Sequence, residues 1–229
     1  MITPAPSSQP LVPVIAIDGP SASGKGTVAQ LVADTLGFAY LDSGALYRVV
    51  AFATQQKNIA WDNAEAVAEC AKALSIQFKN GQVYLNNADI SDEIRTEAMG
   101  KGASQVAIHA PLRAALVELQ HSFCKSPGLV ADGRDMGTVI FPEAELKIFL
   151  TASTEVRANR RYQQLIGKNQ AANYESILLD LQERDARDKG RASAPLIMAK
   201  DAVLLETDHL TISEAVNVVL QNYQQKICK

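Results

Sequence analysis

The sequence contains few of the residues on which disulfide frameworks, zinc sites and histidine chemistry depend. Its 229 residues include three cysteines and three histidines, namely Cys70, Cys124, Cys228, His109, His121 and His209. The cysteines are odd in number, far apart and lack the C-x-x-C spacing of a metal site. This pattern is typical of proteins kept in a reducing compartment, so we expect no disulfides, no cysteine-bound metal and a cytoplasmic location.

Long apolar runs and an excess of one charge are also missing. No apolar run approaches the roughly 18 residues of a membrane helix, and no basic segment followed by a hydrophobic one marks a signal peptide. Lys and Arg total 22 against 25 Asp and Glu, for a net charge of −3. We therefore expect no membrane and no nucleic-acid partner, and any basic patch must be local.

Length and composition favour one globular domain. With 229 residues and 47% hydrophobic content, the chain can bury a sizeable core. Residues 1–13 hold four of the nine prolines, a composition that favours a disordered N-terminal tail. We expect the folded domain to span 14–229 and to act as a monomer.

The most informative stretch lies directly after this tail. A β-branched run over 14–18 predicts a strand, and apolar residues at helical spacing predict a helix over 25–36. Between them, Gly19, Gly24 and Lys25 fill the G-x-x-x-x-G-K spacing of a phosphate-binding loop. Backbone N–H groups would surround the phosphates, and the lysine would reach the outer ones and act in catalysis. The loop residues predicted to bind ATP phosphates are Gly19, Ser21, Ala22, Ser23, Gly24, Lys25, Gly26 and Thr27.

The metal-binding position of this loop departs from the common motif. Gly26 stands where most phosphate loops carry Ser or Thr, and Thr27 follows it. The Gly-Lys-Gly-Thr ending resembles that of nucleoside monophosphate kinases. Thr27 is therefore the candidate ligand for Mg²⁺, directly or through a water molecule.

Apolar runs and helical periodicity alternate along the chain. Five runs predict core strands near 14–18, 38–42, 129–132, 146–151 and 203–207. Capping boxes predict a helix from Asp62 and Glu65 to about residue 74, and a closing helix from Thr211 and Glu214. This order predicts an α/β fold with three layers, built on a five-stranded parallel sheet. With the phosphate loop after its first strand, this fold resembles that of a phosphate-loop (P-loop) kinase.

Residues 75–94 follow a different pattern. Apolar and polar residues alternate on both sides of Asn80-Gly81, the strongest hairpin signal in the chain, and we expect a third strand over 89–94. A helical stretch over 98–124, broken near Pro111, is expected to pack beside this small antiparallel sheet. An antiparallel sheet between βα units indicates a separate β insert lobe.

A basic segment follows the fourth predicted strand. Eight basic residues lie in it: Arg157, Arg160, Arg161, Lys168, Arg184, Arg187, Lys189 and Arg191. Two helices joined by a polar tip at 167–173 would form a movable helical lid. Five acids in the same segment also suit a solvated helical hairpin, but phosphoryl transfer needs cations along the donor phosphates. We predict Arg157 and Arg161 at the ATP phosphates, and Arg184, Arg187 and Arg191 in catalysis.

These patterns divide the expected domain into three parts. The core comprises 14–62, 125–156 and 192–229, the insert about 63–124, and the lid about 157–191.

Charged and polar side chains follow two of the predicted strands. Asp132, Arg134 and Asp135 come directly after the third strand, and Ser43 and Arg48 follow the second. Parallel strands present their carboxyl ends at one edge of a sheet, where α/β proteins bind ligands. Crowded like charges need a ligand or counter-ion, so the pattern favours a binding site over a solvated turn.

Five motifs resemble those of bacterial cytidylate kinases. They are Gly-Pro-Ser-Ala-Ser-Gly-Lys-Gly-Thr at 19–27, Leu-Asp-Ser-Gly-Ala-Leu-Tyr-Arg at 41–48, Ala-Ser-Gln-Val-Ala at 103–107, Asp-Gly-Arg-Asp-Met-Gly-Thr at 132–138 and Glu-Arg-Asp-Ala-Arg-Asp at 183–188. The resemblance runs from about residue 13 to near the end of the chain. It implies transfer of the ATP γ-phosphoryl group to CMP and dCMP with Mg²⁺, and an insert in place of the small acceptor lobe of other nucleoside monophosphate kinases.

The resemblance also implies roles for single residues. Ser43, Arg48 and Arg134 match positions that hold the acceptor phosphate. Ser104, Arg113 and Asp135 match those that recognise cytosine. Arg184, Asp188 and Arg191 match lid contacts to the same nucleotide, and Asp132 is grouped with this acceptor site. Ala22 departs from the glycine of many relatives, and would cost on the order of 1 kcal/mol if its φ is positive.

The chemistry of phosphoryl transfer suits these residue types. The second pKa of a phosphate monoester is near 6, so the acceptor is largely a dianion at pH 7 and needs no general base. A carboxylate such as Asp135 accepts a hydrogen bond from the cytosine amine and repels the uracil carbonyl. Two alternatives stay open: a kinase for another small acceptor, such as UMP, shikimate or gluconate, and a regulatory nucleotide-binding module.

Overall fold

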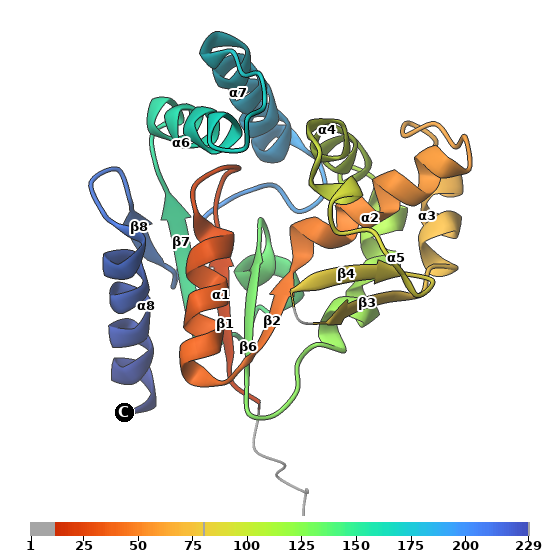
Figure 1. Ribbon diagram of the computed structural model, residues 1–229. Helices are drawn as coiled ribbons and strands as arrows, with labels where there is room; N and C mark the ends of the chain where they lie inside the picture. Colours follow the sequence, from red (N-terminus) through yellow and green to blue (C-terminus); the bar gives the residue numbers. More distant parts are fainter. Residues whose placement is uncertain (1–11, 80, 229) are drawn as a thin grey trace, which may run out of the picture.

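A five-stranded parallel sheet forms the centre of the computed structural model, which describes residues 12–79 and 81–228 (Figure 1). The strands follow the order β2-β6-β1-β7-β8. Their bounds are Val14–Asp18 for β1, Ala39–Asp42 for β2, Leu129–Gly133 for β6, Leu146–Thr151 for β7 and Val203–Glu206 for β8. The predicted parallel sheet is confirmed. Of the predicted N-terminal tail at 1–13, residues 1–11 lie outside the described residues.

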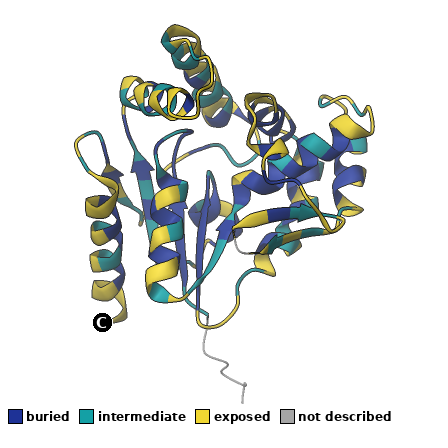
Figure 2. Cartoon of the chain, in the orientation of Figure 1, coloured by how far each residue is buried: buried dark blue, intermediate teal, exposed yellow. Residues whose placement is uncertain are grey.

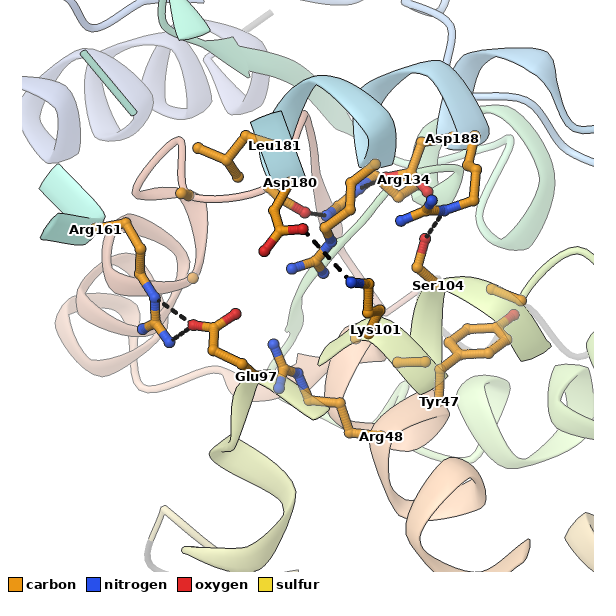
Figure 3. Close-up of a pocket in the computed structure, with 18 of the residues that line it drawn as sticks. Tyr47, Arg48, Glu97, Lys101, Ser104, Arg134, Arg161, Asp180, Leu181 and Asp188 are labelled. Carbon is orange, nitrogen blue, oxygen red and sulfur yellow. Dashed lines mark hydrogen bonds and ion pairs between the residues drawn. The ribbon is translucent and has the colours of Figure 1, made fainter. Parts of the chain in front are cut away.

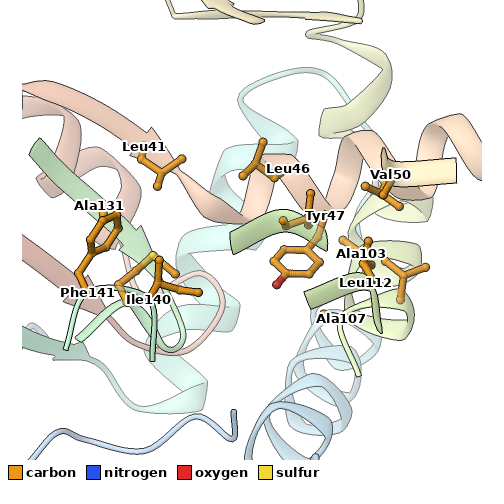
Figure 4. Packing of buried hydrophobic residues seen from close by; sticks show 14 of the residues in the cluster. Leu41, Leu46, Tyr47, Val50, Ala103, Ala107, Leu112, Ala131, Ile140 and Phe141 are labelled. Carbon is orange, nitrogen blue, oxygen red and sulfur yellow. The ribbon is translucent and has the colours of Figure 1, made fainter. Parts of the chain in front are cut away.

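The sheet separates two layers of helices because side chains of a strand alternate between its faces. Ile15 and Ile17 of β1 pack with α1 (Lys25–Leu36) and α8 (Ile212–Ile227) on one face. Val14 and Ala16 pack on the other face with α2 (Ser43–Gln56) and α5 (Ala110–His121), in a cluster that includes Leu41, Leu46 and Leu112 (Figure 4). All five residues of β1 are buried, so this strand is covered on both faces (Figure 2).

A second, smaller sheet lies beside α2. It contains β3 (Ile76–Lys79), β4 (Gln82–Leu85) and β5 (Ala88–Asp89), all antiparallel. Val83 of this sheet packs with Val49 of α2 in a small apolar cluster. The predicted β insert is confirmed, and α3 (Ala64–Lys72) and α4 (Glu97–Val106) complete this part of the chain.

Two antiparallel helices stand over the carboxyl ends of the strands. They are α6 (Thr154–Ile166) and α7 (Tyr174–Gly190), and Figure 1 shows them facing α4. Ser153 caps α6 by accepting a hydrogen bond from the N–H of Val156, and Asn173 caps α7 in the same way. Within the described ranges 12–79 and 81–228, no helix is both long and apolar enough to cross a bilayer.

Several predicted boundaries are wrong by a few residues. Asn63, and not Asp62, caps α3, because two neighbouring residues with short polar side chains have equal local propensity to do so. The third strand ends at Asp89, whose carboxylate accepts from the N–H of Ser91 and turns the chain before the expected strand can form. A short 3₁₀ helix covers Glu93–Arg95 instead.

The helical stretch predicted over 98–124 is broken near Pro111, as expected, and the break separates α4 from α5. Pro111 itself lies in the first turn of α5, where its missing N–H leaves no hydrogen bond unmade. The helix after β2 begins at Ser43, because the Asp42 carboxylate caps it through the N–H of Ala45. The capping box of Thr211 and Glu214 is confirmed at the start of α8.

Candidate active site

A cleft of about 580 Å³ lies at the carboxyl ends of β2 and β6, beneath the two helices of the lid. Its walls come from the loop before α1, from α2, α4 and α5, and from the lid helices (Figure 3). This edge is where parallel sheets bind ligands, because strands, loops and helix N-termini meet there. Most of the charged residues singled out in the sequence line it.

The loop at 19–24 has the backbone of an anion-binding turn. Gly24 precedes α1 with φ +92, and no side chain caps this helix, which leaves the N–H groups of its first turn open to a phosphate. A Cβ on Gly19 would lie 1.9 Å from the Leu150 carbonyl oxygen, so only glycine fits where the loop leaves β1. Ala22 has φ +59, the left-handed conformation in which a Cβ is strained.

Lys25 is buried at the base of this loop. Its ammonium group donates a hydrogen bond to the Pro20 carbonyl oxygen at 3.3 Å. Burial lowers the pKa of Lys25, and the nearby Arg134 guanidinium lowers it further. A cation in such surroundings gains most from an anion placed beside it, as a nucleotide phosphate would be.

Asp132 lies against the phosphate loop and not only beside the acceptor residues. A Cβ on Gly26 would come within 2.9 Å of its carboxylate, which also accepts a hydrogen bond from the Tyr40 hydroxyl at 3.1 Å. Burial raises the pKa of Asp132, and the neighbouring Asp42 raises it further, whereas Lys25 opposes the shift. The two carboxylates therefore form a local negative site next to the loop.

Three guanidinium groups converge on the cleft from three different elements. Arg48 of α2 donates to the carbonyl oxygens of Ile94 and Thr96 at 2.9 and 3.1 Å. Arg48 and Arg184 of α7 both lie against Gly100, since a Cβ there would be 3.0 and 3.4 Å from their nitrogens. Burial lowers the pKa of Arg184 to about 10, and repulsion from Arg134 and then Arg48 adds to the shift. This cluster has the charge of a phosphate site.

Arg134 joins the phosphate loop to the lid. Its Nε donates to the Asp188 carboxylate at 2.8 Å, and its Nη2 donates to the Ser21 hydroxyl oxygen at 2.7 Å. Asp188 in turn carries a lowered pKa: burial opposes ionisation, and Arg134 more than offsets it. One guanidinium therefore contacts the donor loop on one side and the lid on the other.

Asp135 is the most deeply buried acid of the cleft wall, with 2% of its surface exposed. Its carboxylate pairs with Arg113 and lies 3.7 Å from Nη2 of Arg191. The Arg113 guanidinium also lies over the Tyr47 ring, 5.7 Å from its centre. This arrangement holds a carboxylate at a fixed place between two cations, as recognition of a base edge requires.

Three other predicted site residues, Ser43, Ser104 and Arg161, each form a hydrogen bond or an ion pair with another side chain. The Ser43 hydroxyl donates to Gln120 at 2.9 Å, and the Arg187 guanidinium donates to the Ser104 hydroxyl oxygen at 3.2 Å. Arg161 pairs with Glu97 of α4, across the cleft from the lid (Figure 3).

Comparison with known proteins agrees with this geometry. The family model for cytidylate kinase matches residues 15–225. A cytidylate kinase of Paraburkholderia phymatum is 59% identical over 93% of this chain and 93% of its own length. One from Chromobacterium violaceum is 55% identical over 94% of this chain and 97% of its own length. The chain belongs to the cytidylate kinase family.

The fold also resembles that of a solved structure with low sequence identity to this chain. A protein from Eubacterium ventriosum, described as uncharacterized, superimposes with a TM-score of 0.51 over 93% of this chain and 98% of its own, at 10% identity. That likeness concerns the fold alone.

Most of the site residues expected for a cytidylate kinase share the one cleft. Those that line it are Ser21, Ala22, Lys25, Gly26, Ser43, Arg48, Ser104, Arg113, Asp132, Arg134, Asp135, Arg161, Arg184, Arg187, Asp188 and Arg191. Those that do not line it are Gly19, Ser23, Gly24, Thr27 and Arg157. Thr27 is exposed on the first turn of α1.

The position of Arg157 differs most clearly from the expected one. Its guanidinium is buried and donates to the carbonyl oxygens of Ala152 and Ser21 at 2.9 and 3.1 Å, and to Thr154 and Asp185 at 2.9 and 2.6 Å. These contacts use its N–H groups to hold the loop and the lid together. The side chain therefore faces the outer side of the phosphate loop.

Sequence reasoning also missed residues of this site. Arg160 donates to the carbonyl oxygens of Ser23 and Thr207, and so supports the outer side of the loop next to Arg157. Glu97 and Lys101 of α4 line the cleft and pair with the lid at Arg161 and Asp180. No motif marked these residues, because surface helices commonly carry such charges.

Proposed function

We propose that the chain transfers the γ-phosphoryl group of ATP to CMP and dCMP, giving ADP and CDP or dCDP. One observation carries the proposal: a phosphate loop and a cluster of three guanidinium groups line the same cleft, together with a buried carboxylate suited to cytosine. Similarity to cytidylate kinases at 55–59% identity supports the choice of acceptor.

The donor would lie along the phosphate loop. N–H groups at the start of α1 and the Lys25 ammonium would surround the β- and γ-phosphates. Arg157 and Arg160 hold the carbonyl oxygens of Ser21 and Ser23 on the outer side. Because these carbonyls point outward, the N–H groups of the loop are free to face the phosphates.

The acceptor phosphate would lie among Arg48, Arg134 and Arg184, with Ser43 beside them. This phosphate is mostly a dianion at pH 7 and can attack as it stands, so the protein orients two anions and supplies no base. Arg184, Arg187 and Arg191 reach the cleft from the lid or its end and would neutralise charge as the transfer proceeds. Asp188 would help to hold the acceptor sugar.

Recognition of the base would rest on Asp135, with Ser104 and Arg113. The carboxylate can accept a hydrogen bond from the exocyclic amine of cytosine, and uracil presents an oxygen there. A wrong base would leave this buried acid facing an acceptor, which costs a few kcal/mol. Cytosine is therefore favoured over uracil.

Mg²⁺ is the expected cofactor, and the residues beside the loop fit it. Among residues 12–79 and 81–228, no three His, Cys, Asp or Glu side chains form a metal cluster. Kinase Mg²⁺ is instead held by substrate phosphates and water with one or two carboxylates, and Asp132 beside the loop would meet this demand, whereas the exposed Thr27 lies outside the cleft. Such an ion would supply positive charge that stabilises the transferring phosphates.

The natural test is an acceptor panel with ATP as donor. Production of ADP would be measured for CMP, dCMP, UMP, AMP, shikimate and gluconate. We expect CMP and dCMP to react fastest, with kcat/KM for CMP at least tenfold above UMP. Faster reaction with UMP, shikimate or gluconate would assign the chain to another acceptor, and no transfer to any of them would leave a nucleotide-binding module.

The oligomeric state and the cellular location of the protein are part of the same proposal. We propose a cytoplasmic monomer that binds ATP and CMP or dCMP and no nucleic acid. The nearly even balance of charge supports the absence of a nucleic-acid partner. Light scattering should give a mass near 24.7 kDa, and a dimer mass would refute the monomer.

A further inference from the structure

Asp18 connects the donor side of the core to the acceptor side. It is the last residue of β1 and directly precedes the phosphate loop. Its two carboxylate oxygens accept hydrogen bonds from the backbone N–H groups of Met136 and Gly137, both at 2.8 Å. These two residues come directly after Asp135, the proposed cytosine contact, so Asp18 anchors the segment that carries it.

The anchored segment is an unusual turn that cannot shift freely. Met136–Ile140 forms one π-type turn, in which the N–H groups of Val139 and Ile140 both bond to the Asp135 carbonyl oxygen. Met136 is fully buried, and a Cβ on Gly133 would lie 2.9 Å from its side chain. The backbone of Asp135 is thus held from the downstream side by Asp18 and by the turn itself.

Burial of a carboxylate at this position is energetically unfavourable. Asp18 is 5% exposed and belongs to none of the ion pairs within the described part of the chain. Burial raises its pKa to about 6; the charged groups that face it are Asp135, which raises this pKa, and Arg134, which lowers it. Asparagine would avoid this desolvation but offers one oxygen, and its NH₂ group would face an N–H donor. Stability alone therefore does not account for the acid.

We propose that Asp18 is a positioning residue for base selectivity: by holding both N–H groups, it sets Asp135 and Arg134 in the orientation that favours cytosine. The inference rests on the proposed function, because it concerns how that acceptor is recognised. It adds a residue of β1, outside the cleft, to those that determine the acceptor.

Substitution Asp18→Asn tests this role, with Asp34→Asn on the exposed side of α1 as the matched control. Each variant would be checked for folding by circular dichroism, then assayed with CMP and UMP at several ATP concentrations. We expect Asp18→Asn to lower the ratio of kcat/KM for CMP over UMP about tenfold, to raise KM for CMP, and to leave KM for ATP within twofold. A folded variant with an unchanged ratio would overturn the proposal.

A second measurement uses the unmodified protein and does not depend on the variant's folding. The CMP-to-UMP ratio of kcat/KM would be measured between about pH 5.5 and 7.5, where both acceptor phosphates titrate alike and cancel. Protonated Asp18 carries an O–H that competes with one of the two N–H donors, so we expect the ratio to fall below about pH 6. The ratio should stay level across this pH range in Asp18→Asn, which would assign the fall to Asp18. A level ratio in the unmodified protein would overturn the proposal.

The two proposals fail in different ways. Equal kcat/KM for CMP and UMP in the unmodified protein at pH 7.5 would overturn the proposed function, and this inference with it. A clear preference for CMP that persists in Asp18→Asn would overturn this inference alone.

Discussion

Arg157 and Asp185 lie on different helices of the lid, yet they form a two-pronged ion pair with N–O distances of 3.2 and 2.6 Å. The same guanidinium donates to the carbonyl oxygen of Ser21 in the phosphate loop at 3.1 Å. Arg134 also contacts both the loop and the lid: it donates hydrogen bonds to the Ser21 hydroxyl oxygen and to Asp188, which lies one turn after Asp185 on α7. The lid and the loop are therefore connected through the carbonyl oxygen and the hydroxyl oxygen of Ser21.

Removal of the Arg157 guanidinium should destabilise the protein. In Arg157→Met, the carboxylate of Asp185 and the carbonyl of Ser21 lose their partner, and breaking a buried pair costs about 3 kcal/mol of unfolding free energy. Urea unfolding would measure it. Lys72→Met removes an exposed pair with Glu69 and should leave the free energy of unfolding nearly unchanged, because solvent screens such a pair. Equal effects of the two substitutions would show that the Arg157 pair is not structural.

Lys25 should be required for turnover and not for folding. Lys25→Met removes the ammonium that would neutralise the donor phosphates, so we expect kcat to fall at least 100-fold. The melting temperature should fall little, because methionine suits a buried site. Lys168→Met, at the exposed tip of the lid, is the control and should keep full activity. Near-normal turnover of Lys25→Met would remove the phosphate-loop assignment.

Asp135 should control the choice of base. In Asp135→Asn, the amide has one oxygen and no charge, so Arg113 and Arg191 lose their counter-ion and the base loses its acceptor. We expect KM for CMP to rise and the preference over UMP to narrow by about 10- to 100-fold, equivalent to roughly 1–3 kcal/mol. Steady-state kinetics with both nucleotides would decide. The exposed Asp92→Asn should match the unmodified protein, and an undiminished preference in Asp135→Asn would place base recognition elsewhere.

The left-handed backbone of Ala22 should be relieved by glycine. Its φ of +59 strains the Cβ by about 1 kcal/mol, which Ala22→Gly removes, although the greater freedom of glycine in the unfolded chain offsets part of the gain. We expect the free energy of unfolding to rise by about 0.5 kcal/mol. Ala66→Gly, within α3, should lower it by about 1 kcal/mol, since helical alanine is not strained. A fall in both variants would refute strain at Ala22.

The stability of the protein should depend on the titration of Asp18. Burial raises the pKa of this carboxyl from 3.8 to about 6, so the folded protein holds the proton more tightly than the unfolded chain does. Its contribution to stability is therefore complete below about pH 3.8 and is lost as the pH rises through 6. Relative to Asp18→Asn, the unmodified protein should lose about 3 kcal/mol between these limits. Unfolding free energies measured for both proteins at about pH 3.5, 5 and 7, which span the two pKa values, would contradict this if their difference stayed constant.

The sequence by itself determined the features that depend on neighbouring residues. The phosphate loop, the parallel strands and the hairpin insert follow from spacing and periodicity, which act over a few residues. The acceptor residues came from motifs such as Asp132 to Thr138, and the structure gathers them in one cleft. The ends of elements were less certain, as Asn63 shows, because adjacent polar residues compete for the same cap.

Only the tertiary structure decided which partner each charged residue takes. Asp18 resembles an ordinary polar strand end, yet the pairing of β1 with β6 brings it to N–H groups more than 100 residues away. Arg157 and Arg161 share one helix and one sequence pattern, but they face opposite sides of the loop: one is buried against Ser21, and the other reaches Glu97. Such choices depend on strand register and on how helices pack. These are set by the burial of the whole core and leave no trace in local spacing.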